Sequence, residues 1–232
     1  MSLVSNLFLL FVAASILIYY IVPRKSQWIV LLIFSYLYYI AGGPRYVVFI
    51  LFSTLVTWLM ALLIEKAEGK ENHKGARKLL ILGLILNFGM LGIVKYTNFA
   101  LENINALLHL NLRGIQLLLP LGISFYTFQS SGYLLDVYWK RCKAERHPLK
   151  YALFVSFFPQ ILQGPIGRYS RLADQLYAEH RFEGNNIIRG FERILWGFFK
   201  KMILADWAAA FADAIFEDPA KYNGVALLGV LF

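Results

Sequence analysis

The sequence predicts an all-α, polytopic membrane protein with about five or more transmembrane helices plus interfacial or re-entrant ones, and three observations support this fold class. Of the 232 residues, 59% are hydrophobic and only 16% are charged, whereas soluble domains carry roughly 45–50% apolar and about 25% charged residues. The apolar residues gather in long runs, and the basic residues fall between those runs. No internal repeat or flexible linker divides the chain. We therefore expect a single membrane domain over residues 1–232.

Five apolar runs are candidates to cross the bilayer, whose hydrocarbon core takes about 20 helical residues. They are Leu3–Val22, Trp28–Ala41, Tyr46–Ile64, Leu79–Val94 and Leu117–Tyr138. The first run has no basic residues before it and no signal-peptidase-like site after it, so we interpret it as a retained helix. The second run is short for a span, so we expect it to be tilted, re-entrant or extended by its neighbours.

The loops between these runs alternate between rich and poor in basic residues. Twelve basic residues fall in three loops: Arg24, Lys25, Lys66, Lys70, Lys74, Arg77, Lys78, Lys140, Arg141, Lys143, Arg146 and Lys150. The intervening loops carry Arg45, Lys95 and Arg113. The positive-inside rule places the three basic loops in the cytoplasm and the N-terminus outside. These loops are topology anchors, or alternatively a docking surface for an acidic carrier or anionic lipid.

The net charge of +9 would suggest a nucleic-acid partner in a soluble protein. Here the bilayer explains the basic residues, so we expect no nucleic acid as a partner. The single cysteine, Cys142, excludes an internal disulfide, and no metal-type cysteine spacing is present. We therefore predict no metal site.

A polar stripe lies between the fourth and fifth runs. Its members are Asn98, Glu102, Asn105 and His109, which are separated by four, three and four residues. This spacing places them on one helical face. It predicts an amphipathic helix in the outer interface.

The fifth run carries a second polar row. Tyr126, Gln129, Tyr133 and Asp136 follow one another at three, four and three residues, and Pro120 suits a first helical turn. Four polar residues in register indicate a face that meets protein or a wet cavity rather than lipid. For Asp136 the alternative is an interfacial ion pair with Lys140, four residues on.

The stretch FFPQILQGPIGRYSRLADQ (157–175) mixes apolar residues with helix breakers and polar side chains. The run Tyr151–Ile161 is too short to cross alone, which favours a re-entrant segment. The breakers and polar residues are Pro159, Gln160, Gln163, Gly164, Pro165 and Arg168. Broken backbone at membrane depth must be buried in protein or line a cavity. The two amides therefore either satisfy the loosened backbone or line that cavity.

Residues 185–216 predict a helix within or along the cytoplasmic face, because its charges are too frequent for a lipid-facing span. Lys200 and Lys201 should extend toward head groups. The final apolar run, Val225–Phe232, stops after eight residues without a cap, and we expect the chain to be cut within a helix there.

Three ordered motifs resemble the N-terminal half of the membrane-bound O-acyltransferases. They are LPLGISFYTFQSSGYLLDVY, FFPQILQGPIGRYSRLADQ and RILWGFFKKMILAD. The early SNLFLLFVAASILIYYIVP and LLIFSYLYYIAGG stretches are also similar to the bacterial branch that contains alginate O-acetylase and related polysaccharide acetylases. The resemblance covers essentially the whole chain.

The resemblance implies an O-acyltransferase in the bacterial inner membrane. The enzyme would take an acyl group, acetyl in this branch, from a cytoplasmic thioester donor, either an acyl-CoA or an acyl-carrier protein. It would deliver the group across the membrane to hydroxyls of an exported polysaccharide such as alginate or another cell-envelope polymer. A separate extracytoplasmic acetyltransferase often completes delivery in such systems. The resemblance implies no bound cofactor.

The same resemblance attributes acyl transfer to an intramembrane histidine in the C-terminal half. The histidines here are His73, His109, His147 and His180, and none lies in an apolar segment. We therefore assign no catalytic residue and expect this chain to be inactive alone. For the present half we predict a sheltered substrate tunnel lined by Tyr126, Gln129, Tyr133, Asp136, Gln160, Gln163, Gly164, Pro165 and Arg168.

Two other classes of function stay open. A polar row beside a broken helix also describes the permeation path of a transporter or channel, although no pair of interrupted spans occupies matching positions of two halves. The basic loops would equally suit a non-catalytic scaffold that recruits cytoplasmic partners.

Overall fold

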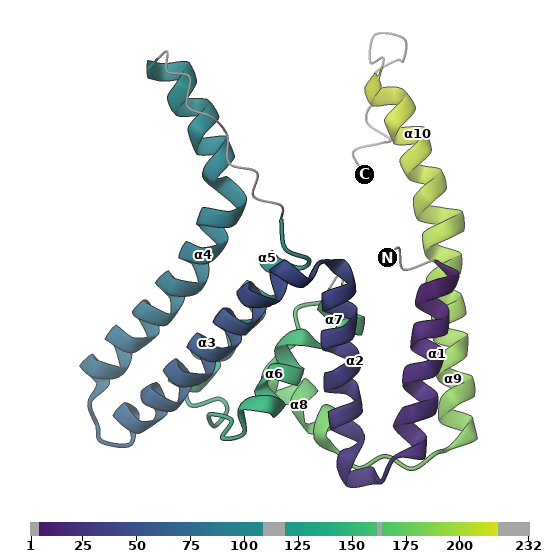
Figure 1. Ribbon diagram of the computed structural model, residues 1–232, viewed down its shortest axis with the longest axis horizontal. Coiled ribbons are helices and arrows are strands. Elements are labelled where there is room, and N and C mark those ends of the chain that lie inside the picture. The colour runs from purple at the N-terminus through teal and green to yellow at the C-terminus, as the bar shows by residue number, and fades with distance from the viewer. Residues whose placement is uncertain (1–4, 109–118, 162–163, 218–232) are drawn as a thin grey trace. The chain divides into compact units, whose positions relative to one another are not determined.

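The computed structural model describes residues 5–108, 119–161 and 164–217, and these residues contain helices and no strands. They divide into two compact units, Met1–His180 and Arg181–Phe232. Figure 1 shows their helices along the chain. The all-α prediction is confirmed for the described residues.

The first unit contains the helices that position the candidate site. They are α1 (Asn6–Ile21), α2 (Gln27–Gly42), α3 (Val47–Glu68), α4 (His73–Leu108), α5 (Ile123–Tyr138), α6 (Pro148–Ser156), α7 (Phe158–Ile161) and α8 (Tyr169–Tyr177), with short 3₁₀ turns at η1 (Arg24–Ser26) and η2 (Pro44–Tyr46). Two stretches, Pro44–Glu68 and His73–Leu108, are long and apolar enough to cross a membrane, and α1 is apolar but shorter. The count of five or more spans stays a prediction.

The second unit contains α9 (Gly184–Phe199), the π-helical turn η3 (Lys200–Ala205) and α10 (Asp206–Glu217). The helix expected over residues 185–216 is therefore present, with a π-helical turn inside it. The run Val225–Phe232 lies outside the described residues.

Two expected elements differ in the structure. The amphipathic stretch after Val94 is helical to Leu108, but it continues α4 rather than forming a separate helix, because neither glycine nor proline interrupts it. His109 lies outside the described residues. Helix α5 begins at Ile123, so Pro120 precedes the helix instead of occupying its first turn. The reason is Gly122, whose φ of 67° is left-handed and non-helical.

The centre of the first unit is formed by α3, α4 and α5, each of which packs against the other two. Asn87 of α4 is fully buried between α3 and α4. Its side chain accepts a hydrogen bond from Ser53 Oγ (2.6 Å) and donates to Thr57 Oγ1 (3.0 Å) and to the Gly83 carbonyl (3.0 Å). Interhelical hydrogen bonds of this kind hold membrane helices together.

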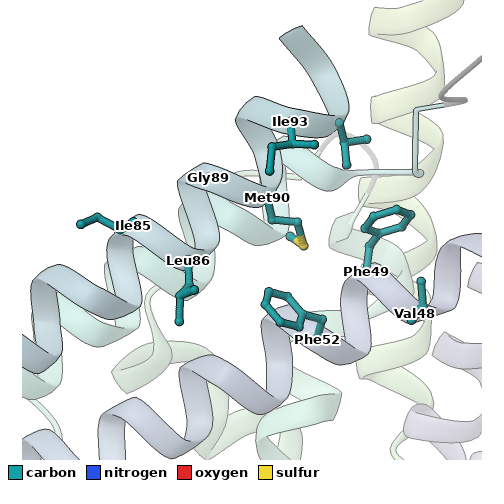
Figure 2. Close-up of a pocket in the computed structure, with 9 residues that line it drawn as sticks. Val48, Phe49, Phe52, Ile85, Leu86, Gly89, Met90 and Ile93 are labelled. Carbon is teal, nitrogen blue, oxygen red and sulfur yellow. The ribbon is translucent and has the colours of Figure 1, made fainter. Parts of the chain in front are cut away.

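A hollow of about 460 Å³ opens between α3 and α4 (Figure 2). Phe49 and Phe52 of α3 face Leu86 and Met90 of α4 across it. Its lining contains only glycine and apolar side chains, so it offers no group for acid–base or nucleophilic chemistry.

The loop after α5 is fastened to the end of α3. The Glu65 carboxylate accepts hydrogen bonds from the Ala144 N–H (3.0 Å) and from the Arg146 guanidinium. The indole N–H of Trp58 donates to the Glu145 carbonyl (2.9 Å). These contacts fix residues 139–147 beside the polar end of α5, where the candidate site lies.

Gly122 and Gly132 provide a matched test of how α5 is positioned. A Cβ at Gly122 would require a left-handed alanine and would overlap the Ile161 carbonyl oxygen, whereas a Cβ at Gly132 would meet nothing within 4 Å. We expect Gly122→Ala to lower the free energy of unfolding by about 2 kcal/mol or more and Gly132→Ala to leave it nearly unchanged. Denaturant titration of the purified protein in detergent measures both, and equal stabilities would contradict this packing.

The rate at which the Cys142 thiol is alkylated should continue to rise at a higher pH than that of a free thiol. Its burial, with the nearby Asp136 and Glu65 carboxylates adding, raises the pKa of the thiol to about 11. Only the thiolate is nucleophilic, so alkylation by iodoacetamide should still increase about tenfold per pH unit near pH 10, where a free thiol with a pKa of about 8.5 has levelled off. Mass spectrometry of the alkylated peptide measures the rate, with glutathione as the reference. A plateau shared with glutathione would show that Cys142 is not shielded.

Candidate functional site

The polar row of α5 faces the protein interior. Tyr126, Gln129, Tyr133 and Asp136 are each no more than 7% exposed, whereas Phe128 on the same helix is 47% exposed. The spacing of three, four and three residues therefore produces one buried polar face, as the sequence predicted. A polar face in a membrane helix is turned inward because lipid offers it no hydrogen-bond partner.

Three members of this row are held by specific contacts. Gln129 Nε2 donates to the Phe154 carbonyl of α6 (3.0 Å), and the Tyr133 hydroxyl accepts from the Glu145 N–H (2.8 Å). The Asp136 carboxylate lies 3.6 Å from the Arg141 guanidinium.

The alternative of an Asp136–Lys140 ion pair is wrong. Helix α5 ends at Tyr138, and Lys140 has a positive φ of 60°, so the i,i+4 geometry is lost. Lys140 instead pairs with Glu68 of α3 at 3.1 Å.

Other hydroxyls around α5 are buried, and several of them interact with one another: Tyr39 with Tyr126, Tyr36 with Thr54, and Tyr151 with Ser130. They belong to Tyr126, Thr127, Ser130 and Ser131 of α5 and to Tyr36, Tyr39, Thr54 and Tyr151 of neighbouring helices. Buried polar groups in proteins are almost always paired. This interior is therefore polar, and its hydroxyls pair mainly among themselves.

A pocket of about 230 Å³ opens beside the C-terminal half of α5. The segment before α8 forms its other wall. The lining consists of Gln129, Gly132, Tyr133, Leu135, Asp136, Trp139, Arg141, Ile166, Gly167 and Arg168. The structure thus brings together Gln129, Tyr133, Asp136 and Arg168 from the predicted set, across about 40 residues of sequence.

The remaining predicted residues lie outside this lining. Tyr126 is buried further along α5. Gln160 lies in the short helix α7, Gly164 and Pro165 lie in the segment that leads to Arg168, and Gln163 lies outside the described residues. Whether these residues line a substrate path stays a prediction.

The Gln160 side chain stabilises the segment before Arg168. Its Nε2 donates to the Pro165 carbonyl, which favours the alternative that the amide satisfies loosened backbone. A Cβ on Gly164 would lie 2.7 Å from Gln160 Cγ, and one on Gly167 would lie 2.6 Å from Gln160 Nε2. Gly164 is therefore needed, because its Cβ would also lie 2.8 Å from the Gln160 Cα, whereas the amide end of Gln160 could shift to admit a Cβ at Gly167.

Tyr169 anchors the residue beside it, Arg168. Its hydroxyl donates to Glu145 Oε2 (2.5 Å), and its ring lies 4.7 Å from that of Tyr133 and 5.0 Å from that of Phe154. Burial holds the pKa of Tyr169 well above its usual value, with Tyr177 and Glu145 adding. The phenol is therefore protonated at neutral pH and acts as the donor.

The pocket carries two guanidinium groups and one carboxylate, so it is electropositive. Asp136 pairs with Arg141, and among the described residues no carboxylate lies within ion-pair distance of Arg168. A cation beside an amide and a phenol suits an anionic group or a polarised carbonyl oxygen.

The described histidines lie elsewhere. Tyr19 Oη lies 2.8 Å from His180 Nδ1, and His73 contacts Glu68. The His147 ring stacks edge-on against Trp28. None of the three lines the pocket, and no group of three or more potential metal-binding side chains occurs among the described residues.

Sequence reasoning missed Glu145 and Tyr169, which connect the α5 loop to the Arg168 segment. Glu145 stands in a basic loop and Tyr169 in a mixed segment, and neither belongs to a periodic pattern. Only their contact in the folded chain identifies them.

The chain is similar to known O-acetylating proteins. It is 34% identical to the probable alginate O-acetylase AlgI of Pseudomonas aeruginosa over 98% of this chain and 44% of the relative. It is 33% identical to that of Azotobacter vinelandii over 98% and 46%. It is 34% identical to the peptidoglycan O-acetyltransferase of Helicobacter pylori over 82% and 40%.

The chain spans less than half the length of these curated relatives. No family model and no solved structure matches it. The aligned region nevertheless includes the polar row of α5 and the Arg168 segment, because it covers almost the whole chain. Over the length that it spans, the chain is similar to alginate O-acetylases and to a peptidoglycan O-acetyltransferase, as the resemblance of its motifs predicted.

Proposed function

We propose that the protein is a polytopic membrane O-acetyltransferase that transfers an acetyl group from a cytoplasmic thioester donor to hydroxyls of an exported polysaccharide. The named relatives act on alginate and on peptidoglycan, which supports an acceptor of the cell-envelope polysaccharide class. The observation that carries the proposal is the electropositive pocket between α5 and Arg168.

The pocket residues would bind and orient the donor. Arg168, with Gln129 and Tyr133 nearby, presents donors to a phosphate or to a thioester carbonyl oxygen. The buried aromatic side chains beside it, Tyr151, Phe154 and Tyr169, would keep water from hydrolysing the thioester. We assign these residues to binding and positioning, and we assign no catalytic base to this chain.

The proposed topology determines which side of the membrane the pocket opens to. Five or more spans in the bacterial inner membrane, with the N-terminus outside, place the end of α5 and the loop 139–147 in the cytoplasm. Trp139 and Arg141 lie at this end of the pocket. An acyl-CoA or acyl-carrier protein would reach it from the cytoplasm, and a separate extracytoplasmic acetyltransferase would complete delivery to the polymer.

Arg168 offers the most direct test of the pocket. In the complete protein in its host, Arg168→Gln should lower the O-acetyl content of the exported polysaccharide at least about tenfold, because it removes a charge-assisted contact to the donor. The matched control is Arg171→Gln, an exposed position of α8 outside the pocket lining, which should retain acetylation. Membrane abundance of each variant is measured in parallel. Full acetylation by an abundant Arg168→Gln protein would remove Arg168 from the site.

The side of donor entry can be measured separately. Inside-out membrane vesicles expose the cytoplasmic face, and we expect them to consume added acetyl thioester while sealed right-side-out vesicles do not. Vesicles lacking the protein are the control. Thiol release measures consumption. Equal consumption in both orientations would contradict a cytoplasmic donor.

A further inference from the structure

Helix α9 is an amphipathic helix that the described residues of its own unit leave uncovered. None of its residues is buried, and large apolar side chains such as Ile188, Phe191 and Leu195 are more than half exposed. Exposed apolar stripes of this size mark surfaces that another phase or partner covers. The charged side chains on the opposite face of α9 indicate whether a bilayer or another protein covers the apolar stripe.

The two faces of α9 are separated except at Trp196, which lies on the basic side. At 100° per residue, the other large apolar side chains share one arc of the helix. They are Ile187, Ile188, Phe191, Ile194, Leu195, Phe198 and Phe199. Arg189, Arg193 and the following Lys200 fall in line on the opposite arc, at spacings of four and seven residues. Glu192 is the single acidic residue of the helix and lies at the boundary.

The C-terminal end of α9 has the side chains of a membrane interface. The Trp196 and Phe199 rings stack at 5.2 Å, and Lys200 Nζ lies 5.4 Å from the centroid of the Trp196 ring. Tryptophan and lysine gather at the head-group level of membranes. Lys201 Nζ pairs with the Asp206 carboxylate at 2.9 Å. Lys200, in contrast, has no carboxylate within ion-pair distance among the described residues, so its charge is available to an anion.

We propose that α9 lies in the cytoplasmic head-group layer and binds anionic phospholipid. The apolar arc would enter the acyl region, and Arg189, Arg193 and Lys200 would contact lipid phosphates. Neither arginine lies within ion-pair distance of a carboxylate in the described part of the chain, so their charge is available to lipid. A basic polar face over a wide apolar arc is typical of interfacial helices that select anionic bilayers.

Spin labels on opposite faces of α9 test the proposal in the full chain. In a Cys142→Ser background, Leu195→Cys reports on the apolar arc and Gly197→Cys on the opposite side, where a Cβ meets nothing within 4 Å. The protein is placed in nanodiscs of phosphatidylcholine, alone or mixed with phosphatidylglycerol. We expect the label at 195 to collide mainly with oxygen and the label at 197 mainly with a water-soluble nickel chelate, with the contrast greater in the anionic discs.

A charge variant and a matched control complete the test. Arg189→Gln/Arg193→Gln should abolish the effect of phosphatidylglycerol, whereas Arg77→Gln/Arg171→Gln, at two exposed positions outside α9, should preserve it. If the label at 195 meets the nickel chelate as freely as the label at 197, the apolar arc faces water and the proposal fails. It also fails if that label is shielded from both reagents, since a protein surface then covers the arc, or if phosphatidylglycerol has no effect.

Discussion

A buried polar side chain has to find its partner within the protein, and this constraint sets the rotation of α5. Gln129 meets the Phe154 carbonyl, Tyr133 meets the Glu145 N–H, and Asp136 meets Arg141. Turning the helix by half a turn would separate all three groups from their partners while burying Phe128. Each lost partner would cost on the order of 1–3 kcal/mol, which is large against the marginal stability of a fold. The same constraint buries Asn87 between α3 and α4.

The orientation of α5 has consequences for the segments that follow it. Because Tyr133 points inward, its hydroxyl holds the backbone of Glu145, and the Glu145 carboxylate in turn holds Tyr169. Arg168 precedes Tyr169, so the guanidinium reaches the pocket through a chain of contacts that begins on α5. Gln160 supports the same segment from the other side through the Pro165 carbonyl. Gln160, Gly164 and Arg168 of the mixed stretch are thus parts of one short support that places a cation beside a buried polar face.

Much of this arrangement could be predicted from local pattern. The spacing of Tyr126, Gln129, Tyr133 and Asp136 is helical, so their shared face and its burial follow from the sequence. The helix break before Arg168 follows from proline and glycine. The partner of Asp136 could not be predicted, since a single positive-φ residue at Lys140 ends the i,i+4 geometry. Nor could the Glu145–Tyr169 bond, because it joins residues 24 positions apart that share no periodicity.

The central claim is that the polar face of α5 borders a hydrophilic interior while the opposite face meets lipid. Tyr133 and Phe128 lie about 140° apart around α5; Tyr133 belongs to the polar row and lines the pocket, whereas Phe128 points outward. With Cys142 replaced by serine, single cysteines at these positions can be exposed to a charged methanethiosulfonate in proteoliposomes. Modification of Tyr133→Cys but not of Phe128→Cys is the expected result. The reverse pattern, with Phe128→Cys modified and Tyr133→Cys protected, would contradict the account.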